Sequence, residues 1–173
     1  MSTEQIPADW ETMELRPDGI FTPDCTVFLN EVKVGHITLR IFSLRLRAEI
    51  QVHGNTYNVR RDGFFTPVYI MENEMGEKVA DAARISFWGN KYQVNIAGRL
   101  LQLKFHVFSM KRVYDLIENE QIIGRVGLKK IFSRTLQFHC QKGIPAEARL
   151  FILWLILGFL DQANSDSSNA NNM

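Results

Sequence analysis

Residues 150–160 read LFILWLILGFL, an uninterrupted apolar run without a polar stripe. A helix that is apolar on all sides has to be buried on all sides, either in protein or in lipid. A helix that crosses a bilayer needs about 20 apolar residues, whereas this run is bounded by Arg149 and Asp161. Pro145 precedes the run and suits the first turn of a helix. We therefore predict a buried core helix over residues 145–161.

The middle of the chain alternates apolar and polar residues with a period of two. In the segment 44–53, LRLRAEIQVH, every even position is apolar. The same alternation recurs at residues 36–41, 91–96, 101–107 and 136–140. Successive side chains of a strand point to opposite faces. These segments are therefore predicted to be strands with one dry face and one wet face.

Short turn sequences separate the alternating segments. Gly and Asn tolerate the positive φ that tight hairpin turns require. The predicted turns are Gly54-Asn55, Glu74-Met75-Gly76, Gly89-Asn90, Ala97-Gly98 and Glu118-Asn119. Their spacing indicates an antiparallel meander of about ten to twelve strands. No internal repeat of fixed period is apparent.

A closed barrel satisfies both the one-sided strands and the apolar helix, and it leaves no exposed sheet edge. A barrel of about eight strands has room only for side chains, so enclosing a helix requires more strands. The predicted fold is mainly β, a closed antiparallel barrel around a central hydrophobic C-terminal helix. We expect an acidic N-terminal arm over residues 1–24, the barrel over 25–161 and a disordered polar tail over 162–173.

Composition argues against a nucleic-acid partner, because the formal net charge is only +1. Residues 1–32 hold seven acids and one base, whereas residues 33–61 hold six bases and one acid. We expect the acidic arm to lie against those basic strands. Cys25 and Cys140 are too sparse for a disulfide framework or a zinc cluster. With no targeting run at the N-terminus, this predicts a cytoplasmic protein.

Several short motifs resemble one known superfamily. They are Val113-Tyr114-Asp115-Leu116, then Ile123-Gly124, then the Pro145 helix start and an apolar helix that contains Phe151 and Trp154. The pattern over roughly residues 30–161 resembles the tubby-like superfamily, in particular its LURP-one-related and phospholipid-scramblase-like branch. The resemblance implies a barrel of about twelve strands around a C-terminal helix, with membrane-associated or lipid-binding roles. The Pro-rich region, cysteine cluster and acidic calcium-binding segment of scramblases are not recognisable here.

No local signature of catalysis is present. The sequence contains no Gly-rich phosphate loop, nucleophile elbow or paired metal motif. The four histidines fall on the polar phase of predicted strands without metal-ligand spacing, at His36, His53, His106 and His139. We therefore expect a non-enzymatic protein without a cofactor or a metal.

The candidate binding residues lie in a basic segment. Lys129, Lys130 and Arg134 enclose Ile131 and Phe132. Bases beside apolar residues suit an anionic lipid headgroup, and each Lys or Arg near such a surface contributes about 1 kcal/mol. The same composition also suits an edge strand protected against aggregation. Two further candidates share one strand face, Arg45 and Arg47.

Three functions remain open at this level. The first is a binding or scaffold module that associates peripherally with anionic phospholipid or phosphoinositide. The second is a protein-interaction module without lipid binding, with the acidic residues 1–32 or the polar tail as its contact. The third is a membrane protein anchored by residues 150–160, which ranks lowest because the span is short. The oligomeric state is left open.

Overall fold

A computed structural model of the protein describes residues 7–19, 24–40, 47–63, 65–86, 91–106, 109–110, 112–131 and 133–170, with side chains up to residue 161. These residues form twelve strands and one helix. The strands are β1 (Trp10–Pro17), β2 (Cys25–Leu29), β3 (Val32–Leu39), β4 (Arg47–Val52), β5 (Asn55–Asp62), β6 (Val68–Glu72), β7 (Lys78–Arg84), β8 (Lys91–Ile96), β9 (Arg99–Phe105), β10 (Tyr114–Glu118), β11 (Gln121–Leu128) and β12 (Leu136–Gln141). The helix is α1 (Ala146–Ala170).

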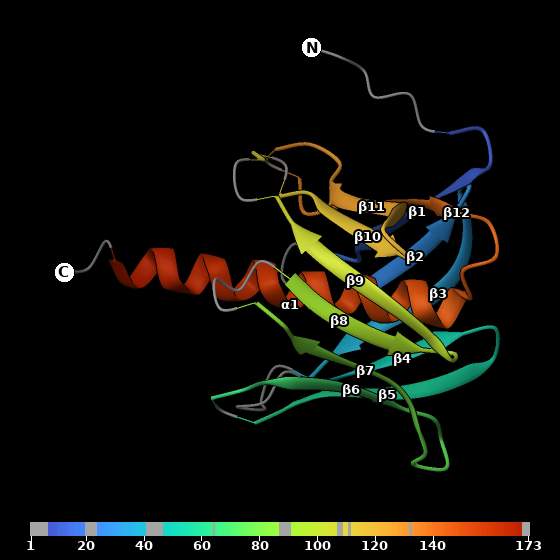
Figure 1. Ribbon diagram of the computed structural model, residues 1–173, viewed down its shortest axis with the longest axis horizontal. Coiled ribbons are helices and arrows are strands. Elements are labelled where there is room, and N and C mark those ends of the chain that lie inside the picture. The colour runs from blue at the N-terminus through green and yellow to red at the C-terminus, as the bar shows by residue number, and fades with distance from the viewer. Residues whose placement is uncertain are drawn as a thin grey trace.

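The strands form a closed antiparallel barrel, as the alternating sequence predicts. Each strand pairs with the next along the chain, and β1 pairs with β12 to close the ring. The register places apolar side chains opposite one another on the inner face, for example Leu15 opposite Leu136 and Ile37 opposite Ile50. Helix α1 runs through the interior (Figure 1). The predicted fold class is confirmed.

The core forms around the apolar run of α1. Every residue from 148 to 156 is buried, and the side chains of Leu153 and Trp154 have no exposed surface. The helix passes close to β3, where a Cβ on Gly35 would lie 2.6 Å from Cδ2 of Leu150 and 2.8 Å from the carbonyl oxygen of Gln51. Glycine at this position therefore lets the helix approach the barrel wall.

Both predicted ends of the barrel domain are corrected. Segment 10–17, predicted to belong to an acidic arm, is a barrel strand whose Met13 and Leu15 face the core. The interspersed acids concealed this strand in the sequence. At the other end the helical backbone continues to Ala170, so the helix does not end at 161 and the predicted disordered tail is helical through 170. Residues 1–6 and 171–173 lie outside the described residues.

Of the acids of the N-terminal region, Asp18 pairs with His36 of the segment 33–61, whereas Glu11 and Glu14 have no partner from that segment among the described residues. Glu11 pairs with Arg149 of α1, and Glu14 pairs with Lys129 and Arg16. Both partners outside the N-terminal region come from the C-terminal third of the chain. The reason is the ring closure, which places β1 beside β12 rather than beside β4 or β5.

The two ends of the barrel differ in the length of their connections. At one end, here called the hairpin end, two-residue turns with positive φ at both residues join four strand pairs: Asn30-Glu31, His53-Gly54, Ala97-Gly98 and Asn119-Glu120. At the opposite end, the loop end, six longer connections join the strands: residues 18–24, 40–46, 63–67, 85–90, 106–113 and 129–135. Helix α1 begins at the hairpin end and leaves the barrel through the loop end (Figure 1).

The predicted turns are largely recovered. Ala97-Gly98 is confirmed, and the turns at 54 and 119 are each displaced by one residue from their predicted pairs. The turn around Gly76 is also present. Gly89-Asn90 lies outside the described residues.

A charge introduced into the buried helix tests this architecture. We expect Leu153→Asp to unfold the whole domain, because an unpaired buried charge costs several kcal/mol against a total stability of about 5–15 kcal/mol. Leu100→Asp is the matched control, since Leu100 is 57% exposed. Thermal melting followed by circular dichroism measures both variants. A folded Leu153→Asp protein that melts like the parent would contradict the buried helix.

Candidate functional site

The connections at the two ends of the barrel carry opposite charge. The six loop-end connections contain seven Lys or Arg and two Asp, whereas the six at the hairpin end, including 142–145 before α1, contain four Glu and one Lys. The bases of the loop end are Arg40, Arg45, Lys111, Arg112, Lys129, Lys130 and Arg134. A chain with a net charge of only +1 thus gathers its surplus cations at one end of the barrel.

Aromatic residues show the same asymmetry. Each loop-end connection contains at least one phenylalanine, and together they hold seven of the twelve phenylalanines and one of the three tryptophans. The hairpin-end connections contain none of either type. These loop-end residues are Phe21, Phe42, Phe64, Phe65, Phe87, Trp88, Phe108 and Phe132. Since connections carry little of a fold's packing and often carry its function, the loop end is the candidate site.

The loop-end sequences share a recurring pattern. Five of the six contain an apolar residue, Phe and then Ser or Thr, at residues 20–22, 41–43, 64–66, 107–109 and 131–133. The sixth, 85–90, carries Phe87. One phenylalanine per connection recurs every 21 to 24 residues, the length of one two-stranded hairpin. Because the connections differ in length, the interval is not constant, and the recurrence is no repeat of fixed period.

Four of the described loop-end residues expose large apolar side chains to solvent. Phe65 is 89% exposed, Met110 is 76% exposed, Ile85 is 47% exposed and Ile131 is 43% exposed. Each lies in a different connection, and these four connections are neighbours around the ring because they join β5 through β12 in order. We call the four exposed residues Phe65, Ile85, Met110 and Ile131 together the apolar crescent.

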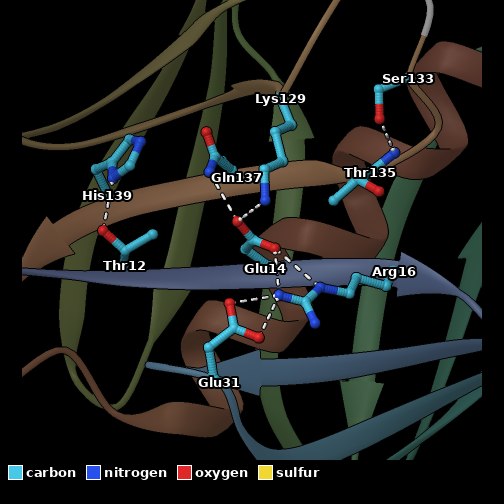
Figure 2. Close-up of polar contacts among 9 residues, drawn as sticks. All are labelled: Thr12, Glu14, Arg16, Glu31, Lys129, Ser133, Thr135, Gln137 and His139. Carbon is cyan, nitrogen blue, oxygen red and sulfur yellow. Dashed lines mark hydrogen bonds and ion pairs between the residues drawn. The ribbon is translucent and has the colours of Figure 1, made fainter.

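The bases of the predicted segment 129–134 differ in whether they already interact with other residues of the chain. The Nζ atom of Lys129 lies 2.7 Å from the Glu14 carboxylate (Figure 2). Arg134 also has an interaction within the chain, and its positive charge offsets part of the rise that desolvation causes in the pKa of Asp161. Lys130 is exposed and has no ion pair among the described residues. Of the three predicted bases, Lys130 is therefore the one available to a ligand.

Glu14 anchors this part of the loop end to the barrel wall. Its carboxylate is buried and accepts hydrogen bonds from Lys129 at 2.7 Å, from Gln137 at 2.8 Å and from Arg16 Nε at 2.9 Å (Figure 2). Desolvation alone would raise the pKa of Glu14, but these donors outweigh it and lower the pKa to about 2. The cluster thus fixes the start of connection 129–135 and leaves Lys130 beyond it.

Arg47, the described member of the second predicted pair, lies in a row of three arginines. Arg40 directly follows β3, and Arg47 and Arg60 lie on β4 and β5. The three positions are neighbours, since Arg47 is opposite Arg60 and its carbonyl accepts a hydrogen bond from the Arg40 backbone at 2.9 Å. These residues line a groove of about 350 Å³ with Ala48, Asn58 and Val59. Arg45 lies outside the described residues.

The middle arginine of this row lacks a counter-ion. Arg60 is held by Asp62 and Glu72, and Arg40 approaches Glu49 at 3.6 Å. Arg47 is exposed and has no ion pair among the described residues. Arg47 is therefore the cation of the groove with which a bound anion would pair.

The histidines and acids elsewhere form structural pairs. His106 Nε2 lies 2.6 Å from Asp115, which also binds Arg125 at 2.7 Å. His36 pairs with Asp18 at 2.8 Å. Across the residues that the structure describes, no group of three or more His, Cys, Asp or Glu is placed to hold a metal ion.

Comparisons with protein-family models, curated proteins and solved structures find no match to this chain. Within the described residues, α1 does not meet the length and hydropathy that a membrane-spanning helix requires.

The Glu14 cluster predicts how stability depends on pH. Because the folded pKa of about 2 is below the ordinary value of 4.5, the cluster stabilises the fold above pH 4.5 and loses this contribution as pH falls toward 2. We expect Glu14→Gln to lower the free energy of unfolding at pH 7 by roughly 3 kcal/mol. Denaturant unfolding between pH 7 and pH 2 measures the effect.

The free energies of unfolding of the variant and its parent should converge toward pH 2, since a protonated Glu14 and a glutamine carry the same charge. Glu120→Gln, in the exposed turn after β10, is the control and should leave the pH profile unchanged. An equal loss of stability in the two variants would exclude a special role for Glu14.

Proposed function

We propose that the protein is a non-enzymatic module that associates peripherally with anionic membrane surfaces through the loop end of the barrel. The supporting observation is the segregation of charge, with seven Lys or Arg and two Asp in the loop-end connections. Each base held near an anionic leaflet contributes about 1 kcal/mol, so several bases on one end suffice for reversible binding.

The free cations define where the headgroups would be contacted. Lys130 and Arg47 are exposed without an ion-pair partner among the described residues. Lys130 lies in the loop-end connection 129–135, and Arg47 is the first residue of β4, at the same end of the barrel. Lys129 contributes less, because its ammonium is already bound to Glu14. The arginine groove adds a concave site in which Arg47 would bind a phosphate group, since Arg40 and Arg60 already have carboxylate partners.

The acidic N-terminal region is a weaker candidate for a protein contact. Glu11, Glu14 and Glu31 all form ion pairs with Arg or Lys of the same chain. An outside basic partner would have to displace these contacts. The observations therefore favour the lipid surface over an interaction through the acidic region.

Vesicle co-sedimentation tests the proposal. Binding should require anionic vesicles and fall between low and high salt, since screening weakens contacts between exposed charges. The variant Lys130→Glu/Arg47→Glu should bind at least about tenfold more weakly than the parent. The matched control is Lys33→Glu/Lys142→Glu, which changes the net charge by the same amount. Both lysines are exposed and lie near the hairpin end, so this variant should bind like the parent.

Equal weakening in the two double variants would indicate that net charge alone governs binding. A parent protein that ignores both anionic and neutral vesicles would overturn the proposal. Parallel vesicles containing a phosphoinositide or phosphatidylserine at equal surface charge would show whether the arginine groove distinguishes a phosphate monoester.

A further inference from the structure

We propose that the apolar crescent inserts its exposed side chains into the membrane interface, so that attachment combines insertion with charge attraction. This inference rests on the proposed function and specifies how the same end engages the bilayer. The members of the crescent are the exposed side chains of four described residues, one in each of four connections: Phe65, Ile85, Met110 and Ile131.

The exposed apolar residues of the crescent are placed for insertion. Phe65 and Met110 are exposed by 89% and 76%, and each lies in a connection beyond the end of a strand. Removing such side chains from water is favourable in proportion to their apolar area. Four exposed apolar side chains on consecutive connections therefore provide several separate insertion points at one end.

The surrounding residues favour a lipid interface as the occupant. Lys111 and Arg112 follow Met110 in the sequence, Lys130 precedes Ile131 and Arg84 precedes Ile85. Aromatic and long apolar side chains with adjacent Lys and Arg characterise segments that lie in the interface of anionic membranes. The crescent lies between the two free cations of the proposed function, with Lys130 in its last connection and Arg47 beside its first.

The hairpin end provides an internal contrast. Met75 is 80% exposed there, but it lies in the turn between β6 and β7 with Glu74 and Glu77. An anionic surface would repel this turn. Val32, Leu100 and Ile122 are also exposed near the hairpin end. Exposure of apolar side chains is thus shared by both ends, and the ends differ in the charge of their connections, with four Glu and one Lys at the hairpin end.

The path of α1 determines how the barrel would be oriented. The helix leaves through the loop end (Figure 1), and its sequence beyond residue 160, DQANSDSSNA, is polar. Such a segment cannot enter hydrocarbon without a large cost. The barrel therefore tilts so that the crescent meets the bilayer while α1 remains in water. The acidic connection 18–24 joins β1 to β2 and lies outside the crescent.

Environment-sensitive labels test insertion directly. Single cysteines replace residue 65, 110 or 75 (Phe65→Cys, Met110→Cys and Met75→Cys) and carry a nitrobenzoxadiazole dye. Native Cys25 and Cys140 are buried, and burial raises the pKa of each thiol to about 11. They therefore react slowly, and the labelled parent chain measures any background.

With vesicles of phosphatidylcholine and phosphatidylserine, the dye at 65 and 110 should shift its emission to the blue and brighten. The emission of the dye at 75 should keep its wavelength and intensity. The unlabelled variant Phe65→Ser/Met110→Ser should bind these vesicles roughly tenfold more weakly. Its residual binding should remain sensitive to salt, because the cations are unchanged.

The two proposals fail in different ways. Salt-sensitive binding without a dye response at 65 or 110 would overturn insertion and leave the charge-based association standing. Absence of vesicle binding by the parent would overturn both, and the exposed crescent would then be assigned to a protein contact. Equal dye responses at 65, 110 and 75 would contradict a defined orientation.

Discussion

The structure depends on the requirement that an entirely apolar helix be buried on every side. The run 150–160 offers no polar face to solvent, so the sheet has to surround it. Enclosing a helix needs more strands than the roughly eight that a side-chain-filled barrel uses, and the chain supplies twelve. Closure also explains why β1 must complete the ring despite its acidic sequence.

The core and the hairpin end of the barrel differ from the loop end in what they contribute to the molecule. Strands and helix share one core, and the hairpin end is tightened by short turns and by Arg149, which is buried against Glu11 and the carbonyl of Ile144. The loop-end connections differ in length and sequence, as surface connections commonly do. Each nonetheless keeps a phenylalanine. Of these, Phe65 is 89% exposed to solvent.

The proposed membrane contact combines two forces of different range. Charge attraction acts over about 8 Å at physiological ionic strength and draws the loop end toward an anionic surface. Apolar insertion acts at contact and opposes dissociation. Glu14 links these functions to the fold, because its buried carboxylate holds Lys129 and thereby positions the connection that presents Lys130 and Ile131. A single buried acid on β1 thus supports a surface formed by β11 and β12.

The sequence by itself determined the helix, the alternating strands and their closure into a barrel, because these follow from local patterns of polarity along the chain. It also located the basic segment 129–134. Only the tertiary structure decided which of those bases are available, since Lys129 is engaged by Glu14 from 115 positions away. The recurrence of phenylalanine and the gathering of six connections at one end likewise appeared only after closure. Contacts between distant residues depend on ring order and register, which a local pattern does not encode.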